Sequence, residues 1–381
     1  MAWRAAEAGR LILGAHGTTV SENRAASYTL VVQEILVVNP GSTSTKLALY
    51  TGERASESET IRHDAARLLE CGGPWEQFDL RWQAVEEWSA RHAREVAAVA
   101  AMGGMFRPLK GGTYAVNQRM LADARANLQG EHASNLGCAL AGRLAARYGC
   151  PAYVVDAVSV DEFDAVARYS GHPAIERRSL SHALNLHAAA RRAAAELGVA
   201  LAESRLVVAH LGGGISAAPL RGGRIIDVND ASSDGPFSPE RTGGLPLQPF
   251  LDLCFSKKYS EREMRTLVMG HGGLVAYLGT NSAVEVEKRI AAGDEQARGV
   301  YQAMAYQIAK EIGAMATVLE GRLHGIVLAG GLAASAMLVG WIRRRVEFLA
   351  PVLVYAGEDE MGALAAGALR VIRGEEAALE Y

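Results

Sequence analysis

The sequence predicts an α/β protein with two similar domains, each a mixed sheet flanked by helices. Three observations support this fold class. Short apolar runs typical of strands alternate with segments of helical periodicity along the chain. Two strand–turn–strand units with small residues at their tips stand in successive halves of the sequence, and a later strand ends in a double glycine before a helix. A chain of 381 residues is also long enough for two domains.

The first strand–turn–strand unit starts with the apolar run 35–38, which predicts a buried strand. A turn at Pro40 and Gly41 follows, and residues 43–50 then alternate polar with apolar side chains. The tip carries small hydroxyl side chains, a glycine and Lys46. Because glycine lets backbone N–H groups approach an anion, while hydroxyl groups add donors and lysine adds charge, the tip predicts a phosphate site.

The pattern recurs in the second half of the chain. Residues 206–211 and 215–218 predict a second pair of strands around three glycines, and a further strand is expected at 225–228. Residues 325–333 predict a strand, a double glycine and the start of a helix, whose N-terminus is itself an anion site. Neither the P-loop pattern nor Gly-x-Gly-x-x-Gly occurs. Three such units in this order predict two domains that close on one nucleotide.

The rest of the chain alternates helices with short strands. A helix over 181–197 is expected to end at Gly198, and the Ala- and Met-rich helix 300–319 is expected to lie in the core. The other expected elements are a helix that runs into a strand over 82–99, a helix at 135–148, a strand at 153–155 and a helix at 361–372. No low-complexity linker separates the two halves, so the boundary falls within a packed crossing segment.

The predicted domains are 35–165 and 166–372, of which the second carries the nucleotide side. The last residues, 373–381, are candidates to pack on the first domain. Residues 1–34 form an N-terminal extension, since they lack the apolar core of about 7–15 residues that a secretory signal needs. Three interpretations of this extension remain: it is a disordered segment, a peripheral helix, or residues upstream of the natural start.

Composition excludes several classes of function. The formal net charge of −3 gives no polyanion-binding signature, so nucleic acid is not expected as a partner. No run of about 18 uncharged apolar residues occurs, so no membrane-spanning segment is expected. The cysteines have neither paired nor metal-type spacing and therefore indicate a reduced, cytoplasmic protein. They are Cys71, Cys138, Cys150 and Cys254.

Motifs along residues 35–381 resemble one known family. They are similar to those of the butyrate kinases, which belong to the acetate-kinase branch of the actin-like and sugar-kinase superfamily. The matching runs are 39–46, 111–114, 129–135, 155–156, 181–185, 210–214, 234–241, 272–280 and 357–361. The resemblance covers essentially all of the chain except the N-terminal extension.

The resemblance implies two actin-like (ribonuclease H-like) domains with a nucleotide cleft between them. It implies reversible transfer of a phosphoryl group from ATP to the carboxylate of a short-chain fatty acid, butyrate or a branched C4 acid, with Mg²⁺ as cofactor. It also implies a homodimer or a larger homo-oligomer. Such a carboxylate is already ionised at neutral pH, so no base is needed, and catalysis rests on positioning and on neutralising charge.

The resemblance assigns catalytic roles to four residues. Arg241 follows a proline-rich segment that holds the chain in a loop, and the family places this arginine at the transferring phosphoryl group. Asp156 ends the apolar run 153–155, at the carboxyl end of a strand, where it would orient Mg²⁺-bound water or a cation rather than accept a proton. His132 and His182 correspond to the family's two active-site histidines. Each residue also has a structural alternative. Arg241 would be a surface arginine, Asp156 a helix or turn cap, His132 a structural histidine in a loop, and His182 a helix cap.

Further residues are expected to hold phosphate, metal and nucleotide. Asn39 would bind phosphate and Mg²⁺ in the first hairpin, with Glu360 as a metal carboxylate; a capped turn and a glutamate that stabilises a helix dipole are the alternatives. The other phosphate contacts are Ser42, Ser44 and Lys46. The nucleotide contacts are His210, Gly212, Gly213, Gly214, Gly330 and Gly331. Five other histidines are expected to be structural: His63, His92, His187, His271 and His324.

One position departs from the family pattern. Family members carry an arginine before a Gly-Gly pair, and this chain has Met102 there, in the expected substrate and phosphate wall. Loss of a charge aimed at a transferring phosphoryl group costs about 10³–10⁵-fold in rate; Arg107 is a nearby candidate to replace it. The chain is therefore either a working kinase with a more apolar substrate wall or a nucleotide-binding relative with little transferase activity. Acetate kinase and propionate kinase are further alternatives.

Overall fold

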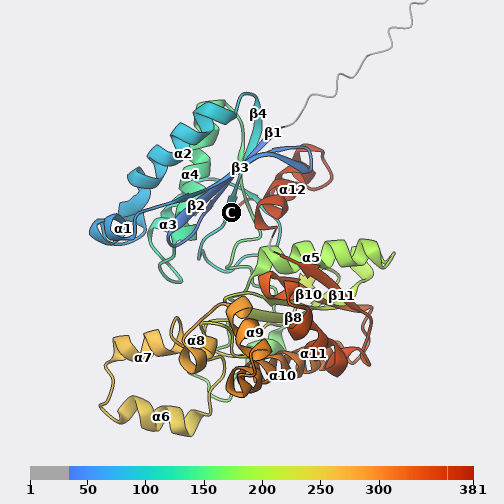
Figure 1. Cartoon of the computed structure of the whole chain (residues 1–381). Coiled ribbons are helices and arrows are strands. Elements are labelled where there is room, and N and C mark those ends of the chain that lie inside the picture. The colour runs from blue at the N-terminus through green and yellow to red at the C-terminus, as the bar shows by residue number, and fades with distance from the viewer. Residues whose placement is uncertain (1–33, 358) are drawn as a thin grey trace, which may run out of the picture. The chain divides into compact units, whose positions relative to one another are not determined.

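The computed structural model of the chain describes residues 34–357 and 359–381. The extension predicted for residues 1–34 therefore lies, apart from Glu34, outside the described residues. The described part contains two sheets, and helices cover both faces of each (Figure 1). This arrangement confirms the predicted α/β class of mixed sheets flanked by helices.

The first sheet has six strands in the order β3-β2-β1-β4-β6-β5. They are β1 (Glu34–Pro40), β2 (Ser44–Thr51), β3 (Arg54–Arg62), β4 (Val96–Met102), β5 (Thr113–Ala115) and β6 (Ala152–Val155). β1 pairs antiparallel with β2 and parallel with β4, so the sheet is mixed. The first predicted hairpin is confirmed, with its tip between β1 and β2.

Alternation along β1 decides which helices cover each face of the first sheet. The helices of this part are α1 (Ala65–Cys71), α2 (Phe78–His92), α3 (Gln118–Arg125), α4 (Gly137–Tyr148) and α12 (Glu360–Ile372). Leu36 and Val38 pack with side chains of α2 and α4. Ile35 and Val37 point the other way and pack with Leu364, Ala365 and Ala368 of α12, which lies beside this sheet (Figure 1). A strand buried on both faces needs such a continuous apolar run.

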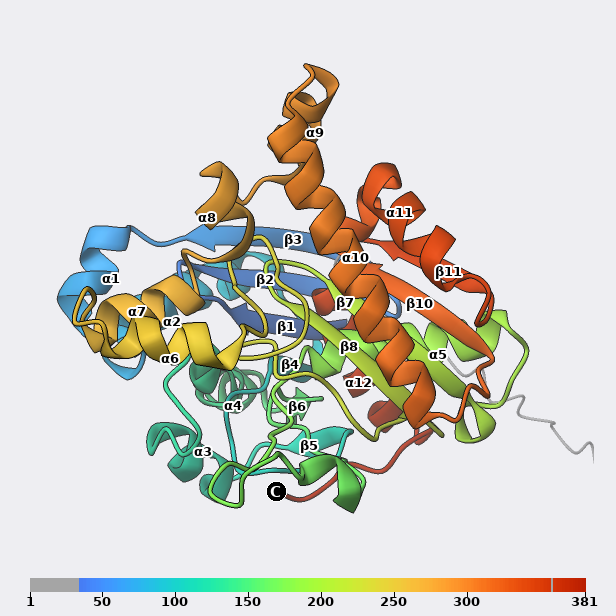
Figure 2. The same ribbon diagram turned by 90° about the horizontal axis from the view of Figure 1, so that it is seen from below.

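The second sheet has the strand order β11-β10-β7-β8-β9. Its strands are β7 (Arg205–Leu211), β8 (Ile215–Arg221), β9 (Arg224–Ile225), β10 (Gly325–Gly330) and β11 (Val352–Ala356). α5 (Ala183–Glu196) covers one face, where it packs with Leu206 and Val208. α10 (Glu295–Val318) and α11 (Ala336–Val346) cover the other face with Val207 and Ala209, and α10 runs across β7 and β8 (Figure 2).

Four further helices lie between the two strand groups of the second sheet in the chain: α6 (Leu247–Phe255), α7 (Glu261–Val268), α8 (Gly273–Leu278) and α9 (Ala283–Ala291). These helices, like β3 and β11, had no counterpart among the predicted elements. The strand expected at 225–228 is shorter, because only Arg224 and Ile225 pair with β8. The expected helix 300–319 starts earlier, since Asp294 caps it by accepting a hydrogen bond from the Ala297 N–H. No helix of the described residues is long and apolar enough to cross a membrane.

The C-terminal segment returns to the first sheet. Sequence-based division placed α12 in the second domain, whereas in the structure Leu364, Ala365 and Ala368 of this helix pack on the first sheet. The chain then runs beside β5, where the Ala115 N–H donates to the Leu379 carbonyl at 2.9 Å. Packing decides this placement, because an apolar helix face fits either sheet and its sequence does not say which.

Candidate active site

The turn between β1 and β2 carries the first group of predicted residues. The register pairs Asn39 with Lys46 across the two strands, and Asn39 Nδ2 donates to Glu360 Oε2 at 2.8 Å. Lys46 Nζ lies 3.4 Å from the same oxygen. Glu360 is the first residue of α12, so the packing of this helix on the first sheet brings its carboxylate to the turn. The structure therefore brings the side chains of Asn39, Lys46 and Glu360 together.

The oxygen atoms of this group fit Mg²⁺. Glu360 offers a carboxylate on a side chain that is 18% exposed, and Ser42 and Ser44 add hydroxyl groups at the turn. Mg²⁺ prefers oxygen ligands and is typically bound by one or two carboxylates together with substrate phosphates. Among the residues that the structure describes, no cluster of three or more His, Cys, Asp or Glu side chains could hold a metal by itself. The donor set therefore fits a metal that arrives with a nucleotide.

Arg241 lies in the loop between β9 and α6. A Cβ atom at Gly214 would stand 2.3 Å from Arg241 Nη1, so only glycine leaves room for the guanidinium group. Nη1 also donates to the Ala231 carbonyl at 2.9 Å. Burial lowers the pKa of Arg241, but an arginine stays charged at neutral pH. The structure thus places this cation against the glycine turn 212–214 of the second domain.

His182 and His210 form a stacked pair beside Arg241. Their ring centroids lie 4.1 Å apart at an interplanar angle of 24°, and His182 Nδ1 lies 2.9 Å from Ser216 Oγ. Burial, and after it the charge of Arg241, lower the pKa of His210 to about 4. Burial, His210 and Arg241 together hold the pKa of His182 well below its ordinary value. Both rings are therefore neutral at pH 7 and suited to hydrogen bonding without charge.

His132 joins this group from the first domain. It caps the short helix at Ala133–Leu136, because its Nδ1 accepts a hydrogen bond from the Ser134 N–H at 3.2 Å. Loss of solvent around the ring lowers the pKa of His132, and the positive charges of Arg241 and Arg81 lower it as well. An Nδ1 that accepts leaves the proton on Nε2, so the neutral ring presents an N–H donor. Residues from both domains thus converge around Arg241.

The double glycine after β10 meets the end of β7. Gly330 has a φ of 97°, and a Cβ atom there would stand 2.5 Å from the Leu211 carbonyl oxygen. Both the positive φ and the lack of space for a Cβ atom require glycine at this position. It places Gly330 and Gly331 directly beside the turn 212–214. The predicted nucleotide contacts of the second domain therefore lie next to one another.

Asp156 belongs to a different group. It follows β6 with a φ of 41°, and its Oδ1 accepts hydrogen bonds from the Gly112 N–H and from His187 Nδ1, each at 2.8 Å. His187 Nε2 lies 3.4 Å from Glu162 Oε2. Within the described residues, no hydrogen bond or ion pair joins Asp156 to Arg241 or to the β1–β2 turn.

His187, which the sequence indicated as structural, lies buried between these two carboxylates. Burial favours its neutral form, but Asp156 and Glu162 outweigh burial and raise the pKa of His187 to about 10. Burial also disfavours the charged carboxylate of Asp156, yet His187 holds the pKa of Asp156 below its ordinary value. The cation that Asp156 holds in this structure is the imidazolium of His187. Gly111 leaves room for this ring, since a Cβ atom there would stand 2.3 Å from His187 Cε1.

Comparison with known proteins identifies the family. A sequence model of the acetokinase family matches residues 170–357. A protein of Caldanaerobacter subterraneus described as a probable butyrate kinase 2 is 50% identical over 346 residues, which cover 90% of this chain and 98% of that protein. The chain belongs to the acetokinase family. A probable butyrate kinase of Listeria monocytogenes is 47% identical over 352 residues, which cover 91% of this chain and 99% of the relative.

Solved structures confirm the fold of this acetokinase-family chain. The acetate kinase of Porphyromonas gingivalis matches it with a TM-score of 0.73 at 16% identity, over 89% of this chain and all of that one. A propionate kinase of Francisella tularensis matches with a TM-score of 0.71 at 17% identity, over 87% of this chain and 98% of the other. Identities this low speak for the fold alone. The predicted pair of actin-like domains is confirmed.

Met102 lies at the end of β4, opposite Val155 of β6. A Cβ atom at Gly137 would stand 2.1 Å from the Met102 carbonyl oxygen, so α4 starts directly against this residue. Arg107, the nearby candidate for the missing charge, ion-pairs with Asp123 at 2.5 Å. Its guanidinium is therefore committed elsewhere and does not replace an arginine at position 102.

Arg81 is a residue of this site that sequence reasoning missed. It lies in α2, one residue before the start that was expected for that helix at residue 82, and its side chain is completely buried. Val85 and Trp88 are buried on the same face of α2, four and seven residues further on. An arginine within an apolar helical stripe was the available signal, because a buried arginine requires a partner for its charge or its donors.

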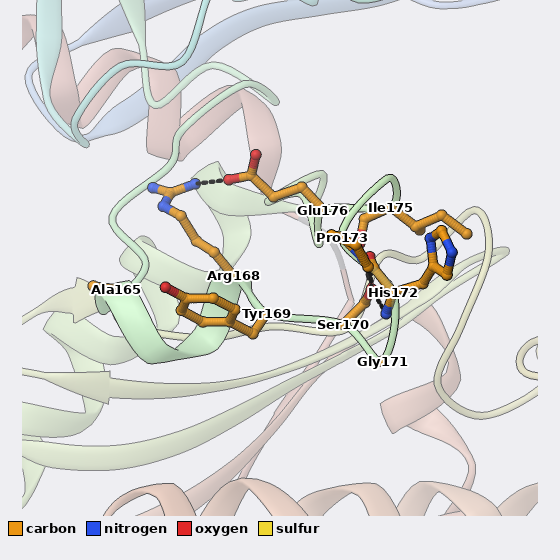
Figure 3. Close-up of a pocket in the computed structure, with 9 residues that line it drawn as sticks. All are labelled: Ala165, Arg168, Tyr169, Ser170, Gly171, His172, Pro173, Ile175 and Glu176. Atoms are coloured by element: carbon orange, nitrogen blue, oxygen red, sulfur yellow. Dashed lines mark hydrogen bonds and ion pairs between the residues drawn. The ribbon is translucent and has the colours of Figure 1, made fainter.

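Further hollows lie outside this group. One of about 570 Å³ is formed by the loop 165–176, where Tyr169 is 81% exposed and Arg168 points toward Glu176 (Figure 3). It contains none of the predicted site residues. Another of about 480 Å³ is lined by Ala329, Tyr355 and residues at the start of α12.

Proposed function

We propose that the chain transfers a phosphoryl group reversibly between ATP and the carboxylate of a short-chain fatty acid, with butyrate or a branched C4 acid as the acceptor. Membership of the acetokinase family makes it a carboxylate kinase. The observation that carries the proposal is that Arg241 lies against the glycine turn 212–214 and near three neutral histidines, His132, His182 and His210. The proposal of a C4 acceptor rests on relatives described as probable butyrate kinases.

Each group has a part in bringing two anions together. Arg241 would neutralise charge on the transferring phosphoryl group, and the Nε2–H of His132 would donate a hydrogen bond to it. Glu360 and the oxygen atoms of the β1–β2 turn would hold Mg²⁺, which supplies charge neutralisation on the phosphates when bound.

Met102 gives the site a more apolar wall than an arginine would. An apolar wall favours the alkyl chain of a C4 acid over the single methyl group of acetate, by about 0.8 kcal/mol for each buried CH₂ group. On this reasoning butyrate and isobutyrate are better acceptors than acetate or propionate.

A second candidate function is nucleotide binding with little transferase activity. It would follow if no other cation replaces the charge missing at Met102; in this structure Arg107 pairs with Asp123. The group of Arg241, His132 and Glu360 favours the active kinase, since binding alone would not need these residues around a transferring phosphoryl group.

An acyl-phosphate assay with acetate, propionate, butyrate and isobutyrate tests both functions. It is run on the chain as given and on Met102→Arg, with ATP binding measured by calorimetry. Turnover of the unmodified chain with C4 acids supports the kinase. ATP binding without turnover, with activity restored by the arginine, supports the second function. Turnover that is fastest with acetate contradicts the proposed acceptor.

Assembly and location complete the proposal. A homodimer or larger homo-oligomer is the expected state, and light scattering on the purified chain measures it directly. The cytoplasm is the proposed location, on the grounds of four cysteines without paired spacing.

A further inference from the structure

Arg81 lies directly beneath the turn between β1 and β2. Its Nη2 donates to the Ser42 carbonyl at 2.9 Å, and its Nη1 donates to the Ser44 carbonyl at 3.0 Å and to Thr45 Oγ1 at 3.2 Å. Nε and Nη2 also donate to Gln77 Oε1, at 3.2 and 2.9 Å. A guanidinium group has five N–H donors, so these bonds use its full capacity.

All of these acceptors are neutral. Within the described residues, Arg81 forms no ion pair with a carboxylate, and burial lowers its pKa while leaving it charged. Its charge reaches the neighbouring groups, since it lowers the pKa of His63 and of His132. The turn therefore stands over a buried positive charge that no carboxylate in the described part neutralises.

The hydrogen bonds also orient the turn. In a planar trans peptide the C=O and N–H groups point in opposite directions. Because the Ser42 carbonyl points down to Arg81, the N–H of Thr43 points away from it, toward the side on which Ser42 and Thr43 are exposed. Arg81 thus draws the carbonyl groups inward and leaves N–H and hydroxyl donors on the outer side.

We propose that Arg81 is a positioning residue that holds the β1–β2 turn in its phosphate-binding shape and adds positive charge from beneath. The inference rests on the proposed function, because it assigns the phosphoryl groups of ATP to the outer side of this turn. Lysine does not replace arginine here, since one ammonium group cannot reach acceptors arranged around a planar fork. The role explains how the first domain attracts an anion although Met102 brings no charge.

Calorimetry with ATP and with adenosine separates this role from a general structural one. The variants are Arg81→Lys and Arg81→Met, and Arg91→Lys is the matched control, an exposed arginine on the same helix. Arg81→Lys and Arg81→Met are expected to raise the Kd of ATP by about 10–100-fold, the loss of one or two hydrogen bonds to a charged group. The Kd of adenosine is expected to stay within about twofold, since only phosphate recognition is removed.

Thr45→Val keeps the test decisive if both Arg81 variants fail to fold. It removes one acceptor of the guanidinium with little change in volume, and it is expected to raise the Kd of ATP by about 3–10-fold with adenosine binding unchanged. Equal weakening of ATP and adenosine, or unchanged ATP binding in folded variants, would overturn the inference. A wild-type chain that binds no ATP contradicts the proposed function instead, so the two failures are distinguishable.

Discussion

Replacing His187 with glutamine tests the buried charge cluster that connects β6, α5 and the second sheet. His187 lies 2.8 Å from Asp156 and 3.4 Å from Glu162, and all three side chains are less than 10% exposed. Glu162 also accepts the Ile225 N–H, at 2.9 Å, so the cluster bridges both sheets. Glutamine keeps some hydrogen bonding but removes the charge, which leaves two buried carboxylates without their common cation.

The structure sets the magnitude of the effect. A pKa raised from 6.5 to about 10 corresponds, at about 1.4 kcal/mol for each tenfold change, to about 5 kcal/mol of stability. Breaking a buried ion pair on one side costs about 3–5 kcal/mol in measured cases, which agrees with this figure. Because the folded-state pKa of His187 is raised, this stability is complete below pH 6.5 and is lost as the pH rises toward 10.

Urea unfolding followed by circular dichroism at pH 6, 8 and 10 measures the prediction. The free energy of unfolding of His187→Gln is expected to fall below that of the wild type by about 3–5 kcal/mol at pH 6. The gap is expected to shrink by about 1.4 kcal/mol for each pH unit between 6.5 and 10. His172→Gln, at an exposed loop position, is the control. A gap that is small at pH 6, or that does not change with pH, would refute a protonated His187.

Three other predictions address the remaining groups. Arg241→Met is expected to lower kcat for acyl-phosphate formation by about 10³–10⁵-fold while ATP binding by calorimetry stays intact, because its charge acts on the transferring group; equal loss of both would contradict this. Glu360→Gln is expected to raise the Mg²⁺ concentration for half-maximal rate about tenfold, since it removes the carboxylate, and an unchanged requirement argues against it. His210, with a pKa of about 4, stays neutral in the folded state while the unfolded chain binds a proton near pH 6.5, so stability is expected to fall between pH 6.5 and 4. His210→Asn should flatten that slope in urea titrations.

Local patterns predicted the elements that surround the site. Glycine tips, apolar runs and a strand end indicated both hairpins, the double glycine after β10 and the strand that ends before Asp156, because each is written in neighbouring residues. The motif resemblance indicated Arg241, His132 and His182, which the structure brings close to one another. Asn39 and Glu360 also meet, although more than 300 residues separate them in the chain.

Contacts between segments far apart in the chain could not be predicted from the sequence. It gave no means of knowing that Arg81 would lie beneath the β1–β2 turn, since the carbonyl groups that it contacts are present in every residue. It placed Asp156 at a strand end but not beside His187, because that pairing depends on how α5 packs.

Sequence by itself therefore determined the α/β class, the two phosphate-type hairpins and the family to which the chain is similar, all of which depend on residue type and spacing. Only the tertiary structure decided that α12 covers the first sheet, that Arg107 binds Asp123 and that a charged histidine stands between two carboxylates. The physical reason is that burial and charge act through space, so the pKa and the partner of a side chain depend on neighbours that folding alone brings together.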